Sequence, residues 1–309
     1  TALAVLLGII VVNVFRPGVG LETALFQDSM STFNAEGMSI SQFLKSFLSN
    51  LFVNPISAMA GGMVLPTVLF SLMLGIALVI AGDQKTAGLL NLLNELFVLI
   101  MMMVGWIMRI APIGIMALLT KLIATQDISL LSALGKFMLV VIGATLFHGA
   151  VVLPGLLYIT TRVSPFHFFS SVMEALVTAF STSSSSATLP VTIRCVENNL
   201  KVDKNIAGFV LPLGATINMD GTALYEAVAA LFVANIMGVE LNIVQQLIVS
   251  FTAIIASIGA PGIPSAGMVT MIMVLQSVGL PAEAIAILLP VDRILDTIRT
   301  TVNVEGDAV

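Results

Sequence analysis

Near its carboxyl end the chain reads Asp292-Arg-Ile-Leu-Asp296-Thr-Ile-Arg299-Thr-Thr-Val-Asn303-Val-Glu-Gly-Asp307, a run of charged residues in an otherwise apolar protein. Asp292, Asp296, Arg299, Asn303 and Asp307 follow one another at intervals of 4, 3, 4 and 4 residues. At about 100° per residue, a helix carries all five within a stripe about 80° wide. At the centre of a membrane helix each Asp or Arg costs about 2.5–3.5 kcal/mol, so such a stripe must face water, ions or a polar ligand. The run therefore predicts a membrane helix with a binding site on one face.

The composition of the whole chain supports a membrane location. Of the 309 residues, 58% are hydrophobic and 9% are charged, and the mean hydropathy is +1.09. A soluble domain carries about 25% charged residues, so we expect an all-α membrane protein with several spanning helices. The long apolar runs do not show the alternating segments of about ten residues that build a membrane barrel. The net charge of −5 argues against a nucleic-acid partner, and the single Cys195 excludes an internal disulfide.

Apolar segments divide the chain into candidate helices. They span about 1–15, 41–82, 86–123, 130–161, 206–237 and 284–309, and two further apolar regions, about 166–199 and 241–280, are broken in the middle. Glycine, proline and polar residues predict turns at 16–18 and 82–85 and an interruption of the second segment between 54 and 66. Residues 19–40, the most polar stretch, predict a long external loop. Because Thr1 already lies in an apolar run, we expect the sequence to belong to a longer polypeptide.

The two broken regions resemble each other. The first has Ser181-Thr-Ser-Ser-Ser-Ser-Ala-Thr-Leu-Pro190 at its midpoint, and the second has Ser257-Ile-Gly-Ala-Pro-Gly-Ile-Pro264-Ser-Ala-Gly267. Their apolar arms are short for a membrane span but long enough for a re-entrant hairpin. Each region is followed by a helix with polar groups at membrane depth. Paired interrupted segments of this kind predict a secondary transporter built from an inverted repeat.

A second polar cluster, Asn218-Met-Asp220-Gly221-Thr222, interrupts the segment 206–237. Gly214 and Gly221 allow the helix to open here and to turn backbone carbonyls inward. Oxygen atoms of this kind coordinate Na⁺ in transporters, and carboxylates and amides of the last helix could join them. The alternative is a structural Asn–Asp pair that joins two helices. The flanking glycines and the second polar helix favour the cation site.

The serine run at 181–186 is interpreted as the tip of a hairpin. A serine hydrolase needs a His or Lys base within reach of its nucleophile. His148 and His167 lie in apolar surroundings, so we do not expect catalysis. A low-complexity loop is a further alternative. We favour the hairpin tip, whose hydroxyls and N–H groups would meet an anionic ligand at a half-helix N-terminus.

Arg299 and Glu226 each allow two interpretations. Arg299 either pairs with Asp296 or binds a ligand carboxylate through its planar guanidinium. Because the aspartates of the stripe outnumber its one aligned arginine, we expect cations, namely a substrate amine and metal ions, to balance the charge. Glu226 either lies at the lipid interface or titrates and carries a proton.

Four motifs together resemble the glutamate transporter family, the dicarboxylate/amino acid:cation symporters that include the excitatory amino acid transporters. The motifs are Ser183-Ser-Ser-Ser-Ala-Thr-Leu-Pro190, Gly214-Ala-Thr-Ile-Asn218-Met-Asp-Gly-Thr222, Ala256-Ser-Ile-Gly-Ala-Pro-Gly-Ile-Pro264 and Asp296-x-x-Arg299-Thr-x-x-Asn303-Val-x-Gly-Asp307. They occur in the family's order and spacing. The resemblance covers the whole chain, from the third membrane helix to the middle of the eighth, so the family's first two helices are expected outside this sequence.

The resemblance implies an elevator-type transporter that forms a homotrimer and crosses the cell membrane several times. Its scaffold would comprise 41–82 and part of 86–123. Its mobile transport domain would comprise 1–15, 130–161 and 166–309, the last including hairpin 1 (166–199), the broken helix (206–237), hairpin 2 (241–280) and the last helix (284–309).

The resemblance also implies residues that bind the substrate. Carried over by position, Asp296 takes the substrate amine and Arg299 takes its side-chain carboxylate. Hydrogen bonds to the substrate would come from Thr222, Thr300 and Asn303. The main-chain carboxylate would lie between the hairpin tips, at Ser183, Ser185, Ile263 and Gly267.

Sodium ions are the coupling ions that the resemblance implies, with H⁺ and K⁺ as further candidates and no other cofactor. One site would use Gly214, Asn218, Asn303 and Asp307. A second would use the backbone of Thr216, Ser257, Ile258 and Ala260. A third would use Asn218, Asp220 and hydroxyls of the family's third helix, of which Thr1 is the one present in this sequence.

Three positions refine the expectation. Asp296 separates this chain from the C4-dicarboxylate members of the family, and Arg299 separates it from the neutral amino acid members. Glu226 matches the glutamate that carries a proton in the proton- and potassium-coupled members. The family's helper guanidinium is missing at Ser183 and at Thr297, and we expect Arg293, one helical turn before Thr297, to fill the same space.

The sequence thus predicts cation-coupled symport of aspartate or glutamate, without covalent chemistry. The alternatives are a C4-dicarboxylate/proton symporter of the same fold or a neutral amino acid transporter, and more remotely an anion channel. An enzyme is not expected.

Overall fold

The computed structural model describes residues 1–21, 45, 48–49, 51–61, 63–125, 128–260 and 262–309. Over these residues the backbone forms helices and turns and no strand, which confirms the all-α prediction. From residue 22 onward, the predicted loop at 19–40 lies outside the described residues. The chain divides into two compact units: unit 1 comprises Thr1–Phe43 and Asp127–Val309, and unit 2 comprises Leu44–Gln126.

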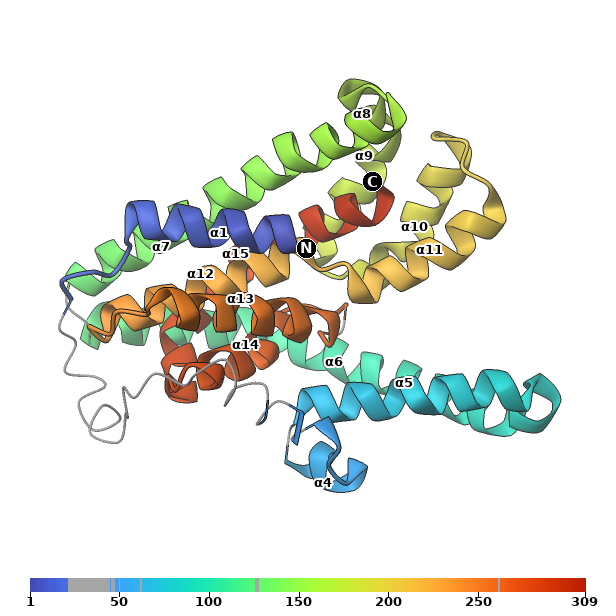
Figure 1. Ribbon diagram of the computed structural model, residues 1–309, viewed down its shortest axis with the longest axis horizontal. Coiled ribbons are helices and arrows are strands. Elements are labelled where there is room, and N and C mark those ends of the chain that lie inside the picture. Colours follow the sequence, from blue (N-terminus) through green and yellow to red (C-terminus); the bar gives the residue numbers. More distant parts are fainter. Residues whose placement is uncertain (22–44, 46–47, 50, 62, 126–127, 261) are drawn as a thin grey trace. The chain divides into compact units, whose positions relative to one another are not determined.

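Unit 2 contains α4 (Pro55–Ala60), α5 (Val64–Ala81) and the long α6 (Asp83–Thr125) (Figure 1). The predicted interruption between 54 and 66 is confirmed. The side chain of Asn54 caps α4 by accepting hydrogen bonds from the N–H groups of Ile56 and Ser57, at 3.0 and 3.3 Å. The predicted turn at 82–85 is wrong in extent: Gly82 alone, at φ 81°, joins α5 to α6. Glycine adopts this positive φ without steric cost, so a turn of several residues is not needed.

Unit 1 begins with α1 (Ala2–Phe15) and continues after the gap with α7 (Ile128–Phe147), the π-helical turn η2 (His148–Val152) and α8 (Leu153–Thr161). Among the described residues, two helical stretches are long and apolar enough to cross a membrane by length and composition: Gln84–Gly114 in unit 2 and Ser129–Thr161 in unit 1. The second stretch includes η2, so the π turn lies within it.

Both broken regions form helix–turn–helix hairpins, as predicted. The first consists of α9 (Pro165–Thr182) and α10 (Ser185–Asn198), and the second of α13 (Ile243–Ile258) and α14 (Ala266–Ser277). In the first, Ser183 takes the left-handed conformation at φ 51° and ends α9. Ser184 then caps α10 by accepting a hydrogen bond of 3.1 Å from the N–H of Ala187. The serine run thus supplies both the end of one helix and the beginning of the next.

The segment 206–237 is a broken helix, α11 (Lys204–Ile217) followed by α12 (Asp220–Ile236), with Asn218 and Met219 at the break. Nearly every residue of α12 is buried, and its many alanines let neighbouring helices approach closely. Figure 1 shows α1, α12 and α13 side by side, and these three helices pack against one another.

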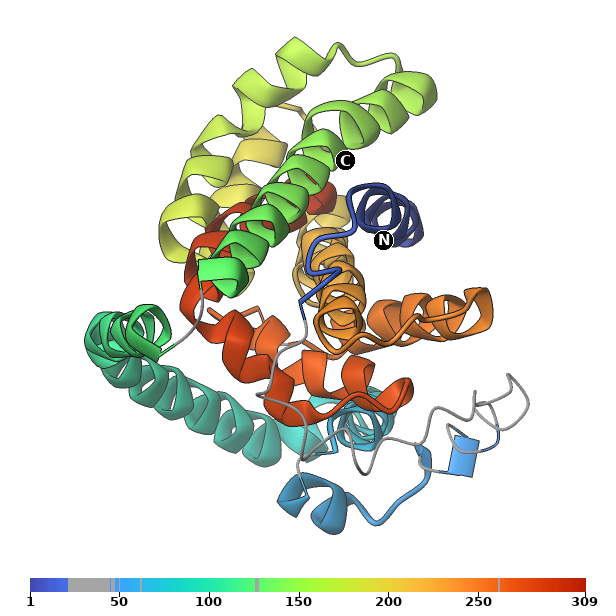
Figure 2. The ribbon, with the colours of Figure 1, turned by 90° about the vertical axis from the view of Figure 1, so that its left-hand side faces the viewer.

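The last helix, α15 (Ile285–Ala308), follows the short 3₁₀ turn η3 (Ala282–Ala284) and contains Pro290. It packs against α9, α12 and α7, and in Figure 2 it is the red ribbon that crosses the green α7. One face of α15 therefore meets the broken helix and another meets the first hairpin. This central position turns its polar stripe toward the interior of unit 1.

Candidate functional site

The polar stripe of α15 lies inside the protein. Asp292, Asp296, Arg299 and Asn303 are exposed by 2%, 6%, 1% and 3%, and Asp307 is half-buried. A stripe that faced lipid would instead show these groups on the surface. The predicted inward orientation of the stripe is therefore what the structure shows.

Arg299 is held by two carboxylates through a single nitrogen. Its Nη2 lies 2.9 Å from Asp292 Oδ1 and 2.8 Å from Asp296 Oδ1. Its Cζ lies 3.9 Å from the centre of the Tyr225 ring, which is a cation–π contact. Within the described residues, Nε and Nη1 are buried and have no hydrogen-bond partner. Unpaired buried donors are costly, so this free edge of the guanidinium is a place where ligand oxygens would be stabilised.

Asp296 is shared between three groups. Besides Arg299, its Oδ2 accepts a hydrogen bond of 2.9 Å from the backbone N–H of Ser265, in the turn between α13 and α14. Arg293 Nη1 lies 3.7 Å from the same oxygen. Arg293 thus reaches the aspartate expected to bind the amine, but as a loose ion pair. Hairpin 2 therefore occupies one oxygen of this carboxylate through the Ser265 N–H.

Thr222, Asn303 and Gly267 lie close to Arg299. Asn303 accepts a hydrogen bond of 2.8 Å from the N–H of Gly221, and its amide nitrogen donates to Thr222 Oγ1 at 3.1 Å. A Cβ on Gly267 would lie 3.1 Å from Thr222 Cγ2 and 3.7 Å from Arg299 Nη1. A Cβ on Gly221 would lie 2.6 Å from the carbonyl oxygen of Arg299, so only glycine allows α12 and α15 to meet here. Helix α12, helix α15 and hairpin 2 therefore converge on the guanidinium.

The tips of the two hairpins touch at Gly262. Its carbonyl oxygen accepts hydrogen bonds from Ser184 Oγ at 2.6 Å and from the N–H of Ser186 at 3.2 Å. Ser183 and Ser185 are buried at this junction, and Ser183 Oγ has no partner among the described residues. In the described part of the chain, the side chains of Ser183, Ser185 and Thr300 form no hydrogen bond with Arg299, so their role in binding stays a prediction. Ile263 packs on Met219, Ala260 and Ala266.

The residues expected at the first sodium site are partly brought together. Asn218 Nδ2 donates to Asp307 Oδ1 at 3.3 Å, and a Cβ on Gly214 would lie 3.0 Å from the same oxygen. Asn303 instead bonds to Gly221 and Thr222. The glycine leaves room beside the Asp307 carboxylate that any side chain would fill. Asn218 presents its amide nitrogen to this carboxylate, and the use of the site by a cation stays a prediction.

The residues expected at the second sodium site lie where α11 packs against α13. Ser257 is fully buried, and its carbonyl oxygen accepts a hydrogen bond of 3.2 Å from the N–H of Ala260. The Thr216 side chain is exposed, and its hydroxyl donates to the carbonyl of Leu213. Ile258 is the last residue of α13. These residues lie on neighbouring elements, and their use by a cation stays a prediction.

Asp220 has partners on both oxygens. Thr1 Oγ1 donates to Oδ1 at 2.7 Å, and His148 Nε2 lies 2.9 Å from Oδ2. The expectation that His148 lies in apolar surroundings is wrong, because α7 and η2 place it against the beginning of α12, far away in the sequence. Asn218 points to Asp307 and makes no hydrogen bond with Asp220 within the described residues.

Glu226 is completely buried. Its Oε1 accepts a hydrogen bond from Thr270 Oγ1 of α14, and its Oε2 has no partner in the described parts of the chain. The interpretation as a residue of the lipid interface is therefore wrong. A buried carboxylate between the broken helix and hairpin 2 fits the alternative, a group that carries a proton.

Sequence reasoning left four participating residues without a role. Asp292 and Tyr225 hold Arg299, His148 holds Asp220, and Glu305 is a further buried acid on α15. The Oε2 atom of Glu305 lies 2.8 Å from where a Cβ on Gly149 would stand. Asp292 could have been found from the sequence, because it belongs to the stripe with spacing 4, 3, 4 and 4. No sequence pattern pointed to Tyr225, His148 or Glu305.

Over the described residues, no three His, Cys, Asp or Glu side chains are grouped as a metal site.

Comparison with known proteins identifies the family. The model of the sodium:dicarboxylate symporter family matches residues 1–309. The chain belongs to this family. The match agrees with the resemblance drawn from the four motifs, and members of the sodium:dicarboxylate symporter family are membrane transporters rather than enzymes.

Among the similar curated proteins is human (Homo sapiens) excitatory amino acid transporter 2, 48% identical over 243 residues, which are 77% of this chain and 42% of the relative. Excitatory amino acid transporter 1 of Ambystoma tigrinum is 48% identical over 255 residues, 81% of this chain and 46% of the relative. Excitatory amino acid transporter 3 of Mus musculus is 48% identical over 246 residues, 79% of this chain and 47% of the relative. The chain thus spans less than half the length of these relatives.

Proposed function

We propose that this chain is the substrate-binding part of a cation-coupled symporter of acidic amino acids. The observation that carries the proposal is Arg299, a buried guanidinium whose Nε and Nη1 have no partner among the described residues and which lies directly beside Asp296. An acidic amino acid has one ammonium and two carboxylates. Arg299 offers a positive charge to one carboxylate of the substrate, and the adjacent Asp296 offers a negative charge to its ammonium.

The second carboxylate of the substrate is assigned to the hairpin tips. Ser183 Oγ is buried there and has no partner in the described part of the chain, and α10 begins at Ser185. Helix N-termini offer free N–H groups to anions. Because the tips meet at Gly262, an opening of this contact would admit the substrate and its closure would exclude water.

Sodium is the coupling ion that the family name suggests, and we assign it to the cluster of Gly214, Asn218 and Asp307. A bound cation would neutralise the Asp307 carboxylate. These residues would hold the ion close to the break between α11 and α12, so binding of the ion would order the same segment that presents Thr222. Glu226 is proposed as a proton carrier, and the sites on Asp220 and on the backbone of Ser257 as further cation positions.

Assembly and movement are also proposals. Unit 2 would belong to a scaffold of a homotrimer in the plasma membrane, and unit 1 would be the transport domain of an elevator mechanism. Support comes from the division of the chain into two compact units and from the large exposed apolar side chains of α6, such as Phe97 and Trp106 at 55% and 57%. In a membrane protein such surfaces meet lipid or other subunits.

The test is uptake of labelled aspartate by proteoliposomes under an imposed Na⁺, H⁺ or K⁺ gradient, one at a time. We expect concentrative uptake with an inward Na⁺ gradient and little competition from succinate, which lacks the ammonium that Asp296 would bind. Arg299→Lys should weaken aspartate binding by about 10- to 100-fold, because Lys keeps the charge but loses the two-pronged geometry. Arg194→Lys, an exposed arginine paired with Glu174, is the matched control. Strong inhibition by succinate would favour a C4-dicarboxylate symporter, and substrate-gated current without accumulation would favour a channel.

A further inference from the structure

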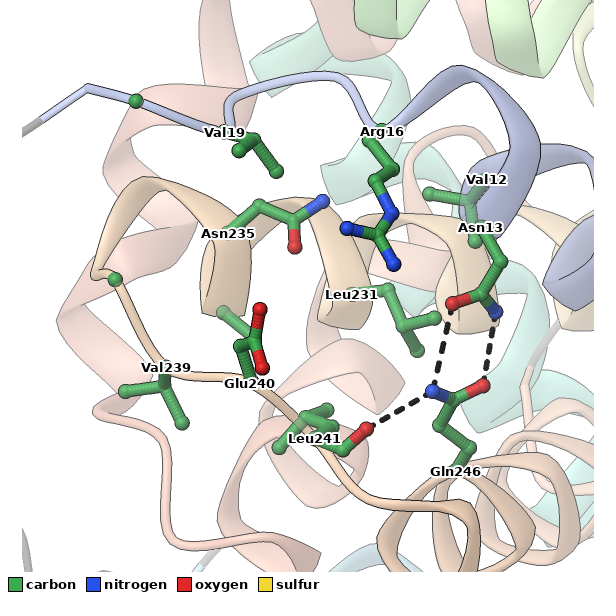
Figure 3. A pocket seen from close by; sticks show the side chains of 13 residues that line it. Val12, Asn13, Arg16, Val19, Leu231, Asn235, Val239, Glu240, Leu241 and Gln246 are labelled. Atoms are coloured by element: carbon green, nitrogen blue, oxygen red, sulfur yellow. Dashed lines mark hydrogen bonds between the residues drawn. The ribbon is translucent and has the colours of Figure 1, made fainter.

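A cavity lies in unit 1, between the end of α1, the end of α12 and the start of α13 (Figure 3). Its volume is about 310 Å³, at the lower end of the range for small-molecule sites. None of the residues assigned above to substrate, sodium or proton binding lines it. It is called the Arg16–Glu240 pocket here, after the two charged residues in its lining.

The two charged residues of the pocket have opposite signs and do not pair. Among the described residues, neither Arg16 nor Glu240 forms a hydrogen bond or an ion pair through its side chain, although both line one small cavity. Arg16 follows α1 in the left-handed conformation at φ 41°, and its N–H bonds to the carbonyl of Val12 at 2.8 Å. Glu240 follows Gly238, whose φ of 69° turns the chain after α12. Figure 3 shows the two side chains entering from these different segments. Both side chains are exposed to solvent, and a ligand that carries both charges would pair with both residues.

The polar walls of the pocket are fixed by amide hydrogen bonds. Asn13 Nδ2 donates to Gln246 Oε1 at 2.8 Å, and Gln246 Nε2 donates to the carbonyl of Leu241 at 2.9 Å (Figure 3). Asn235 Nδ2 donates to the carbonyl of Pro17 at 3.0 Å. These bonds connect α1, α12 and α13 around the cavity. The pocket is therefore formed before any ligand arrives, which lowers the cost of binding.

The surroundings of the pocket are apolar and exposed. On α1, Val14 and Phe15 are 70% and 67% exposed, and on α13 Ile243 and Leu247 are 79% and 56% exposed. In a membrane transporter, such side chains face acyl chains. The pocket also lies where the apolar helix α1 ends and the apolar helix α13 begins, so a lipid beside these helices would have its headgroup near their ends. A ligand with a charged head and apolar chains would match both the cavity and its margins.

We propose that the Arg16–Glu240 pocket binds the headgroup of phosphatidylethanolamine, with the phosphate on Arg16 and the primary ammonium on Glu240. Guanidinium pairs well with phosphate, and an ammonium can donate hydrogen bonds to a carboxylate. The choline headgroup carries no N–H to donate to Glu240, and phosphatidylglycerol has no positive charge there. The acyl chains lie over the exposed side chains of α1 and α13.

The test uses native mass spectrometry of the purified protein, exchanged into equal mixtures of phosphatidylethanolamine, phosphatidylcholine and phosphatidylglycerol. We expect preferential retention of phosphatidylethanolamine. Arg16→Gln should lower the retained phosphatidylethanolamine and phosphatidylglycerol by about tenfold, the factor typical of a lost charge-assisted hydrogen bond. Glu240→Gln should remove the preference for phosphatidylethanolamine over phosphatidylglycerol and leave retention of phosphatidylglycerol unchanged.

The matched controls are Lys204→Gln and Glu283→Gln, which each remove an exposed charge outside the pocket. Both variants should retain lipids as the parent protein does. Melting temperatures of all four variants identify any general loss of structure. A further arm adds soluble glycerophosphoethanolamine, which has the headgroup without acyl chains and should bind far more weakly. Equal retention of the three lipids by the parent protein would overturn the proposal. So would pocket variants that behave as the controls do, or equally tight binding of the soluble headgroup.

Discussion

Asp292 Oδ1 lies 2.9 Å from Arg299 Nη2, two turns along the same helix, and both side chains are buried. Asp296 Oδ1 lies 2.8 Å from the same nitrogen. The guanidinium is thus anchored through one atom, and within the described residues its Nε and Nη1 have no partner and stay available to a ligand. Anchoring of this kind preorganises the receptor for a carboxylate without occupying its bidentate edge.

Asp292→Asn should lower the stability of the ligand-free protein by about 1–3 kcal/mol, since a buried donor of Arg299 loses a charged acceptor. Without the Asp292 anchor the guanidinium is less preorganised for a ligand carboxylate, so the shift of melting temperature on adding aspartate should be smaller than in the parent protein. Thermal unfolding with and without aspartate measures both effects. An unchanged ligand-free stability, or a shift with aspartate equal to that of the parent protein, would contradict the anchoring role. Glu283→Gln, an exposed acid, is the control for removing a negative charge.

Gly262→Ala should separate the hairpin tips. The added Cβ would lie 2.6 Å from Ser186 Oγ and 3.0 Å from its backbone nitrogen. The hydrogen bonds from Ser184 and Ser186 to the Gly262 carbonyl should then weaken, and their segments should exchange amide hydrogens faster. Adding Ser186→Ala removes the closest atom, so the double variant should recover part of the protection. Equal exchange in parent and Gly262→Ala proteins would show that the tips are not closed in solution.

His148→Ala should destabilise unit 1, because the buried Asp220 loses the donor 2.9 Å from its Oδ2. A buried carboxylate that loses one hydrogen bond costs about 1–3 kcal/mol. His167→Ala is a matched control, since His167 is exposed on α9. Midpoints of denaturant unfolding compare the two variants. If both variants lost the same stability, the pairing of His148 with Asp220 would contribute nothing to the free energy of unfolding.

Glu226→Gln should separate proton coupling from substrate binding. The amide keeps an oxygen that can accept the hydrogen bond from Thr270, so the packing of α12 on α14 should survive. A glutamine cannot carry a proton, and uptake of aspartate should therefore lose its dependence on a pH gradient while it keeps its dependence on sodium. Glu174→Gln, on the exposed face of α9, should behave as the parent protein. A pH dependence that persists in Glu226→Gln would remove this residue from the proton pathway.

Several elements could be predicted because their signals are local. The stripe of α15 shows a helical period within sixteen residues, and the breaks at Ser183 and Asn218 coincide with small, polar or turn-forming residues. Such features depend on neighbours along the chain, where periodicity and backbone preference are decisive. The error at 82–85 has the same origin: four turn-forming residues suggested a loop, but Gly82 alone reverses the chain.

The pairing of the site residues could not be predicted in this way. His148 and Asp220 are 72 residues apart, and Ser265 and Asp296 are 31 apart. Neither contact follows from the period of its own helix. Glu226 illustrates the same limit, since its burial depends on hairpin 2 packing across α12.

The amino-acid sequence by itself determined that this is a helical membrane protein of the sodium:dicarboxylate symporter family, with a charged stripe that needed a polar partner. Apolar content, helical period and the cost of charge in lipid are properties of short stretches and require no coordinates. Only the tertiary structure decided which atoms of the described residues already have partners and which do not. These are the single nitrogen that anchors Arg299, its Nε and Nη1, and the two charges of the Arg16–Glu240 pocket. Hydrogen bonds act over about 3 Å between groups from distant segments, so they are set by packing.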